Sequence, residues 1–208
     1  MRAALPIFCI LIILFSCKSD PKKATDETAA PLENDFLIVP GERVGIITGE
    51  TTEETVEDFF GQENVKITSL YMGEEAEREG VVVFPGTENE IEIVWELAAN
   101  IGRPAFVRLN KENSAWKTKQ GVRVGMTLEA LEAINGQPFT FYGFEWDFGG
   151  LVTDWNNGKL SPYLVVALMP QDFDALTPDL LGEVVLSSDD PKVRAVAPKI
   201  GSMVVTFY

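Results

Sequence analysis

The sequence contains no histidine, and that absence excludes several classes of active site. Ser-His-Asp triads and Cys-His pairs use an imidazole as general base, and histidine-ligated zinc sites use it as a metal ligand. The only cysteines are Cys9 and Cys17, both in the apolar first segment of the chain. The remainder therefore has no thiol for a disulfide, a catalytic nucleophile or a metal.

Motifs that bind nucleotide cofactors are also missing. The sequence has neither a Gly-x-x-x-x-Gly-Lys-Ser/Thr phosphate loop nor a Gly-x-Gly-x-x-Gly fingerprint after a strand. Its glycines are better explained as turn residues. We therefore predict no catalytic residues, no cofactor and no metal site, and expect that the chain is not an enzyme.

Basic residues are scarce. There are 17 lysines and arginines against 32 aspartates and glutamates, a net charge of −15. Arg2 is the only charge before Cys17, so loss of the first 16 residues leaves 16 basic against 32 acidic residues, a net charge of −16. Such a surface repels nucleic acid and disfavours adsorption to anionic lipid. Residence on a membrane would therefore need a separate anchor.

The first residues have the anatomy of a cleavable signal. Arg2 is followed by an uncharged apolar run over 3–16 that ends at Cys17. Fourteen helical residues rise only about 21 Å, short of the roughly 30 Å of a bilayer core, which disfavours a permanent span. Residues 14–17 (LFSC) resemble the lipobox of bacterial lipoproteins, although Phe15 is bulkier than usual there. The resemblance implies acylation of Cys17; an ordinary secretory signal is the alternative.

Residues 18–35 (KSDPKKATDETAAPLEND) have almost no bulky apolar side chain and so lack a face that could pack. We predict a signal peptide over 1–16, and a lipidated cysteine with a flexible tether over 17–35. The expected location is the cell envelope, most simply the outer membrane, with the lipid as the contact to the membrane.

From residue 36 on, short apolar runs alternate with turn residues. Each run has the length and composition of a strand, and the intervening Gly, Pro and Asn residues favour hairpins. This predicts an α+β fold, dominated by antiparallel sheet. The expected strands are 36–39, 65–72, 81–84, 91–95 and 104–109, followed by 139–148, 151–155, 163–169, 183–187 and 202–208.

Two predicted helices, 51–60 and 126–135, share a pattern at an offset of 75 residues. Thr51 and Glu54 have the spacing of a capping box in the first helix. The repetition predicts two α+β repeats, 36–115 and 116–208, that share one sheet within one compact unit. The matched pairs are Thr52 and Thr127, Glu54 and Glu129, Val56 and Leu131, Glu57 and Glu132, Gly61 and Gly136, and Gln62 and Gln137.

The second copy, with Gly125-Met126-Thr127, Leu131 and Gly136-Gln137-Pro138, resembles the G-M-T…V/L…G-x-P motif of the SmpA/OmlA (BamE-like) outer-membrane lipoproteins. The resemblance covers about 25 residues, and the first copy has Glu50 in place of the motif glycine. A tandem arrangement of such units resembles β-lactamase-inhibitor-protein-like folds. These families imply small modules that bind other proteins, as assembly factors or inhibitors; fold analogy alone does not choose the partner.

Aromatic residues gather in the segment 139–148. As one strand, it would place Phe139 and Phe141 on one face and Tyr142, Phe144 and Trp146 on the other. A reversal at Gly149-Gly150 would then bring Trp146 close to Trp155 across a hairpin. We take Tyr142, Trp146 and Trp155 as the tentative surface for a partner or ligand, with plain packing as the simpler explanation.

Carboxylates offer the remaining chemistry. A glycosidase-like pair drawn from Glu145, Asp147 and Asp154 is one hypothesis, and a solvated strand face is the simpler one. The acidic clusters at 172–174 and 188–191 could hold calcium, but turns and a helix cap at Asp190-Pro191 explain them better. The glutamates of 74–79 fit a solvated loop or short helix, or a contact for a basic partner.

The sequence as a whole favours a lipid-anchored envelope module that binds another protein without catalysis. The alternatives are a glycan- or small-ligand-binding lipoprotein that uses the three aromatic residues, and a carboxylate-based hydrolase. Nothing in the sequence identifies the partner.

Overall fold

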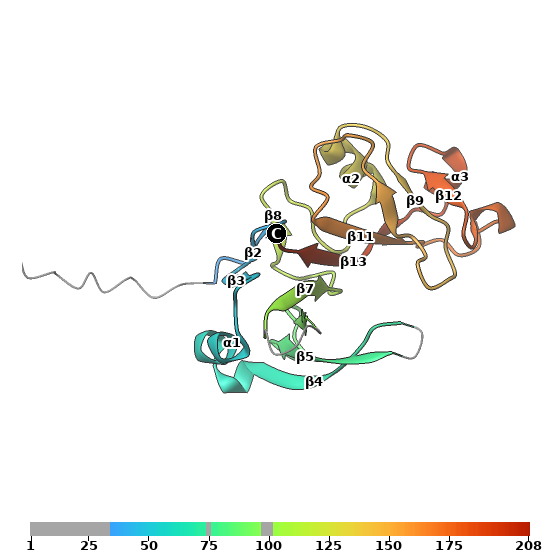
Figure 1. Cartoon of the computed structure of the whole chain (residues 1–208). Helices are drawn as coiled ribbons and strands as arrows, with labels where there is room; N and C mark the ends of the chain where they lie inside the picture. Colours follow the sequence, from blue (N-terminus) through green and yellow to red (C-terminus); the bar gives the residue numbers. More distant parts are fainter. Residues whose placement is uncertain (1–33, 74–75, 97–101) are drawn as a thin grey trace, which may run out of the picture. The chain divides into compact units, whose positions relative to one another are not determined.

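The computed structural model describes residues 34–73, 76–96 and 102–208, which belong to one compact unit (Figure 1). This unit is an α+β fold with mostly antiparallel strands, as predicted. Its helices are α1 (Glu53–Phe60), α2 (Leu128–Asn135) and α3 (Pro191–Ala195). None of the described helices is long and apolar enough to cross a membrane. The predicted signal peptide, Cys17 and most of the tether lie outside the described residues.

The largest sheet has six antiparallel strands. Four of them form a simple meander in chain order, and the last strand of the protein pairs with the last strand of that meander. The order across the sheet is β11 (Leu164–Met169), β13 (Lys199–Thr206), β7 (Pro104–Leu109), β6 (Ile91–Trp95), β5 (Glu77–Val83) and β4 (Val65–Tyr71).

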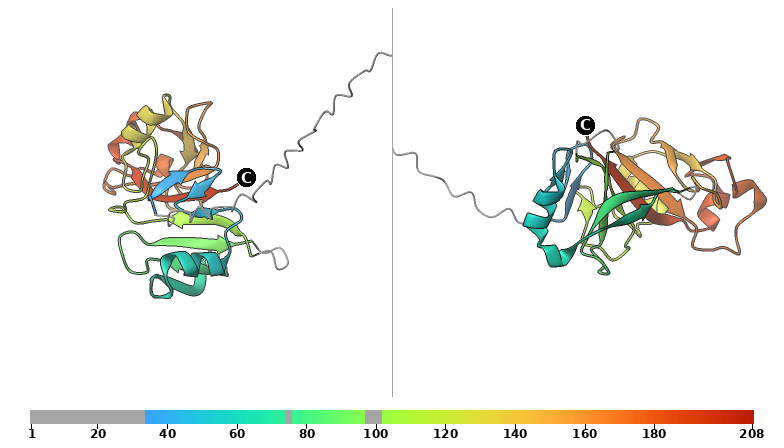
Figure 2. Two further views of the ribbon diagram at one scale, coloured as in Figure 1. Left: turned by 90° about the vertical axis from the view of Figure 1, so that its left-hand side faces the viewer. Right: turned by 60° about the horizontal axis from the view of Figure 1, so that its bottom comes forward.

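A second sheet has the order β10 (Val152–Asp154), β9 (Thr140–Tyr142) and β12 (Val185–Ser187). It joins the first at one place, where Leu151 bridges Ala167 and the Leu168 N–H donates to the Gly150 carbonyl at 2.8 Å. The combined strand order is β12-β9-β10-β11-β13-β7-β6-β5-β4. The final strands of the two predicted repeats, β7 and β13, thus lie side by side in the middle (Figure 2).

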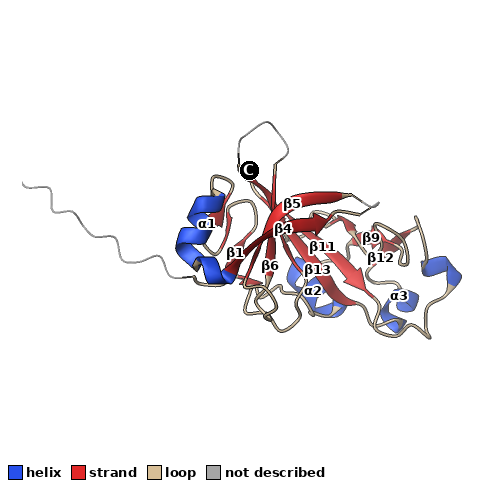
Figure 3. Ribbon diagram, turned by 90° about the horizontal axis from the view of Figure 1, so that it is seen from below, coloured by secondary structure: helices blue, strands red, loops and turns tan. Residues whose placement is uncertain are grey.

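The two long helices agree with the predicted repetition. α1 and α2 each have eight residues at an offset of 75, each follows a threonine cap, and each ends at a glycine with positive φ. α1 lies beside the β4 end of the large sheet and α2 near its β11 end (Figure 3). This is the arrangement that two repeats on one sheet would give; duplication itself stays a prediction.

A third sheet crosses the predicted boundary at residues 115 and 116. Its order is β3 (Ile47–Thr48), β2 (Arg43–Val44), β1 (Leu37–Val39) and β8 (Lys117–Thr118), and β1 pairs with β8 in parallel. Trp116, just before β8, is fully buried and its Nε1–H donates to the Asn89 carbonyl at 3.0 Å. Both predicted halves therefore contribute to one core.

That core runs through the whole unit, with apolar residues from both halves in one cluster. α1 contributes Val56 and Phe60, and α2 contributes Leu128 and Leu131, at the spacing of three to four residues that defines one helix face. Each such side chain stabilises the fold by about 1.5–3 kcal/mol relative to exposure.

The predicted capping box of α1 is wrong by one residue. The helix cap is Thr52, whose hydroxyl accepts from the Thr55 N–H at 3.2 Å. Thr51 is buried, and its hydroxyl accepts from the Thr48 N–H at 2.9 Å. Because Thr51 closes the turn before the helix, the capping role passes to the next threonine, and Glu54 is not part of a box.

Two predicted segments also differ in extent. The run 139–148 is a strand only over β9: the chain bends at Gly143, and Phe144 packs on Phe141 in the core instead of lying on the opposite face. A Cβ at Gly143 would lie 2.7 Å from the Gly182 carbonyl oxygen, so only glycine fits this close approach. β5 begins at Glu77, inside the segment 74–79 that was predicted as a loop or short helix.

The junction between the two sheets depends on Gly150. A Cβ added there would lie 1.9 Å from the Leu168 carbonyl oxygen, and φ is +72°. Gly182 has a similar φ of +78° but open space around it. We expect Gly182→Ala to cost about 1–2 kcal/mol of left-handed strain, and Gly150→Ala to cost roughly 1–3 kcal/mol more through overpacking. Urea denaturation of both variants measures the difference; equal losses would contradict the role of Gly150.

Candidate functional site

The three predicted aromatic residues lie in two separate places. Tyr142 and Trp146 pack edge to face, with ring centroids 5.3 Å apart. Trp155 packs instead on the buried Phe139, at 5.1 Å, and lines a different pocket. The structure does not pair Trp146 with Trp155, because the bend at Gly143 ends the strand that the prediction extended to residue 148.

We define the aromatic patch as Tyr142, Trp146, Phe148, Met169 and Phe173. Trp146 also packs on Phe148, at 5.3 Å, and lines a hollow of about 230 Å³ together with Met169 and Phe173. Phe148, Met169 and Phe173 are 51%, 55% and 58% exposed. Large apolar side chains that gather on a surface in this way mark interaction sites more often than solvated faces.

A tight turn holds the centre of the patch in place. The Trp146 Nε1–H donates to the Gly143 carbonyl at 3.0 Å, and the Trp146 carbonyl accepts from the Gly149 N–H at 2.8 Å. Glu145 adopts a φ of +64°, which is uncommon for a residue with a side chain and occurs where surrounding contacts enforce it. These hydrogen bonds fix the position of the Trp146 indole in the patch.

Four carboxylates line the patch or are chain neighbours of its aromatic residues. Glu145 lines the hollow, Asp147 lies between Trp146 and Phe148 in the chain, and Asp172 and Asp174 flank Phe173; all four are exposed. The chain has no lysine or arginine over 124–158 or 160–191. Lys199 pairs with Met169 in the sheet and is a basic residue at this edge. The patch combines apolar rings with a negative rim.

The acidic clusters have local structural roles, as the simpler hypothesis predicted. The Asp190 carboxylate caps α3 by accepting from the Lys192 N–H at 2.8 Å. The Asp172 carboxylate accepts from the Asp174 and Ala175 N–H groups at 3.1 and 3.3 Å. Within the described ranges, no three acidic residues gather in a way that could hold a metal ion.

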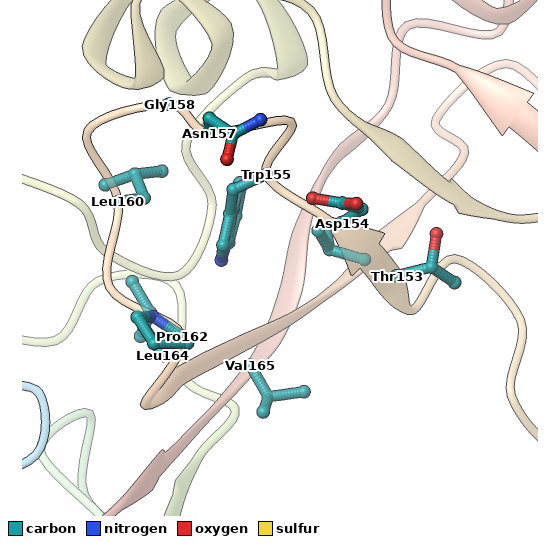
Figure 4. A pocket seen from close by; sticks show the side chains of 10 residues that line it. Thr153, Asp154, Trp155, Asn157, Gly158, Leu160, Pro162, Leu164 and Val165 are labelled. Atoms are coloured by element: carbon teal, nitrogen blue, oxygen red, sulfur yellow. The ribbon is translucent and has the colours of Figure 1, made fainter.

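Trp155 lines a pocket of about 410 Å³ between β10 and β11 (Figure 4). These strands form an antiparallel hairpin that is closed at its base by the Leu151–Ala167 bridge and open toward its loop. Because β10 pairs with β9 while β11 pairs with β13, the two arms separate and leave a wedge.

The pocket loop is held by a buried amide. Asn135, at the end of α2, is 1% exposed, and its Nδ2 donates to the carbonyls of Gln137 and Trp155 at 2.9 and 3.0 Å. Its Oδ1 accepts from the Leu160 N–H at 3.4 Å. A Cβ at Gly158 would lie 2.0 Å from this amide, so the loop approaches it as only glycine can. Asn135 thereby connects the end of α2 to the pocket.

The carboxylates of the hydrolase hypothesis do not meet. Asp154 lines the Trp155 pocket, and Glu145 lines the separate hollow of the aromatic patch. Both are exposed, and so is Asp147. A glycosidase needs two carboxyl groups across one substrate, with the pKa of one of them raised by its surroundings. No observation on the described residues favours that function.

Where the structure shifts a carboxyl pKa, the shift is downward. Hydrogen bonding from Arg43 lowers the pKa of Asp35. The Gly86 N–H, with a contribution from Lys111, lowers the pKa of Glu90. Lys192 lowers the pKa of Asp179 to about 2. Each of these groups is held ionised, which suits a structural partner and not a general acid.

Several residues of these sites escaped the sequence analysis. Phe148, Met169 and Phe173 reach the patch from separated parts of the chain, so no local pattern in the sequence groups them. Asn157 was also missed, although Asn156-Asn157-Gly158 is a strong turn sequence. Asn135 gave no signal at all, because an asparagine at the end of a helix is common.

Comparisons with protein-family models, with curated proteins and with solved structures give no match to this chain.

The amide of Asn135 should dominate the stability of the pocket loop. Asn135→Ala leaves two part-buried carbonyls and one buried N–H without this partner, at about 1–3 kcal/mol per unsatisfied group. We expect a loss of at least about 2 kcal/mol in the free energy of unfolding, and faster hydrogen exchange at Leu160.

Asn157→Gly is the matched control, because glycine accepts its φ of +60° and no described residue hydrogen-bonds its amide. It should change stability by less than about 0.5 kcal/mol. Equal stability of the two variants would show that Asn135 does not hold the loop.

Proposed function

We propose that this chain is a lipid-anchored module of the cell envelope that binds another protein without catalysis. The observation that carries the proposal is the aromatic patch. Rigid aromatic rings and methionine are enriched at the centres of protein interfaces, because they bury much apolar area for little loss of side-chain freedom. Phe148 and Phe173 are more than half exposed in the unbound chain, so a partner would gain from covering them.

Charge specifies the chemistry of the partner. Glu145 lines the hollow of the patch, and three exposed aspartates are chain neighbours of its aromatic residues, within a chain of net charge −15. A protein surface with an apolar centre and lysines or arginines around it complements this arrangement. Such complementarity accelerates association and disfavours acidic competitors more than it raises affinity. An acidic partner, or nucleic acid, would be repelled.

The anchor and tether complete the proposal. Acylation at Cys17 would retain the module at a membrane, and the polar segment 18–35 would act as a leash. A leash confines the patch near the membrane and raises its effective concentration toward other envelope proteins. The outer membrane is the simplest site, in keeping with the lipoproteins that the second repeat resembles.

The patch can be tested by capture from solubilised native envelope, with residues 21–208 as bait and mass spectrometry as the readout. The informative variant is the double substitution Phe148→Ser with Phe173→Ser. Both side chains are exposed, so the change should leave stability within about 1 kcal/mol. Its affinity for the captured protein should fall by more than about tenfold.

Tyr71→Ser is the matched control, because Tyr71 is 63% exposed and lies on β4, outside the patch. It should bind like the unchanged chain. Higher salt should slow association of the unchanged chain, because it screens the acidic rim. A partner retained equally by all three proteins would exclude the patch as the interface.

The anchor has its own test in cell fractionation. Cys17→Ser should abolish incorporation of labelled palmitate and release the exported protein from the membrane fraction, because the lipid is attached through this cysteine. Cys9→Ser, a change of the same kind inside the apolar run, should leave both unchanged. Retention of the Cys17 variant on membranes would count against lipidation.

A further inference from the structure

The Trp155 pocket has the properties of a small-ligand site and is separate from the aromatic patch. Its volume of about 410 Å³ falls in the range of roughly 300–1,000 Å³ typical of such sites. The residues that line it and those that line the hollow of the patch have no member in common. A ligand here would therefore occupy a second surface of the module.

One aromatic ring and an apolar floor form the body of the pocket. Trp155 is half-buried with Phe139 behind it, and its indole stands in the open space between the two arms (Figure 4). Leu160, Pro162 and Leu164 line the opposite side. A flat ligand face with C–H groups would lie well against this ring.

Polar groups stand at the rim. One oxygen of Asp154 accepts from the Asn156 N–H at 2.7 Å, which fixes the carboxylate. No described residue hydrogen-bonds the side-chain amide of Asn157 or the Nε1–H of Trp155, and the latter is not buried. The side chains of Asp154, Asn157 and Trp155 together offer hydrogen-bond donors and acceptors in similar number.

The rim is pre-organised. Asn156 and Asn157 both have positive φ, at 53° and 60°, and the Gly158 N–H donates to the Trp155 carbonyl at 2.9 Å, as in a type I′ turn. The Asn156 side-chain amide donates to the Pro138 carbonyl at 3.0 Å, and the Asn135 side-chain amide donates to the Trp155 carbonyl at 3.0 Å. Because the rim is already fixed, a ligand loses little free energy in ordering it, and this favours binding.

We infer that this pocket binds a short neutral saccharide. A pyranose ring has a C–H face for the Trp155 indole and hydroxyls that both donate and accept, for Asp154 and Asn157. An apolar ligand would strand these polar groups without partners, at a cost of about 1–3 kcal/mol each. A quaternary amine fits the pocket less well, because such cations are bound by cages of several aromatic rings and this pocket has one. The N–H donors of Trp155 and Asn157 would also face the positive charge.

The test is a titration of ¹⁵N-labelled residues 21–208 followed by NMR. The chain has four tryptophans, so Trp155 contributes one of four indole N–H signals, identified by its loss in Trp155→Phe. The probes are glucose, galactose, mannose, N-acetylglucosamine and the disaccharides cellobiose and chitobiose, with choline as the cationic probe. We expect at least one saccharide to shift the Trp155 indole signal and the Gly158 amide, with saturation at millimolar concentration.

Variants separate the pocket from non-specific effects. Trp155→Phe should weaken saccharide binding, followed at the Gly158 amide, by about tenfold or more. Asn157→Gly, which keeps the backbone conformation, should weaken it several-fold. Trp146→Phe, in the aromatic patch, should leave it unchanged.

Two outcomes would overturn the inference. The first is the absence of any saccharide-induced shift at the Trp155 indole in the folded, unchanged chain. The second is a shift with choline alone that disappears in Asp154→Asn, which would make the pocket a cation site. Neither outcome bears on the capture experiment, because the patch variants leave the pocket intact.

Discussion

The antiparallel pairing of β7 with β13 is the contact on which the rest of this fold depends. It joins the last strand of each half, with Leu109 opposite Met203 and Val107 opposite Val205 in the shared core. The partners are 94 to 100 residues apart in the chain, so the pairing forms only after much of both halves is in place. Without it, the meander of the first half and the strands of the second would each expose an edge and half of a core.

The two predicted halves differ in how regularly their strands pair. In the first, β4 to β7 pair along their lengths. In the second, β10 and β11 meet only at the Leu151–Ala167 bridge, and the segment with β12 and α3 is inserted before β13. Both candidate surfaces lie in this irregular half: the pocket where the hairpin opens, and the patch where the chain leaves β9. Binding surfaces commonly form where strands depart from regular pairing.

Local patterns predicted much of the fold. The strands at 91–95 and 104–109 have the expected bounds, and the helices follow the 75-residue offset, because apolar periodicity and threonine and glycine caps act within a few residues. The failures have a different origin. Thr51 lost the capping role to Thr52 because its hydroxyl is used in the preceding turn, and β9 stops at Tyr142 because the Gly182 carbonyl approaches Gly143. In both cases a contact with another segment overrode the local pattern.

The sequence by itself determined the class of the fold, the absence of histidine and thiol chemistry from its body, the acidic character of its surface and the lipoprotein-like start. These follow from composition and short-range order, which need no tertiary contact. Only the tertiary structure separated Trp146 from Trp155. It gathered Phe148, Met169 and Phe173 around Trp146. It also placed Trp155 in a pocket whose loop is held by Asn135. These groupings depend on where the strands diverge, and that is set by long-range pairing instead of by the residues of any one segment.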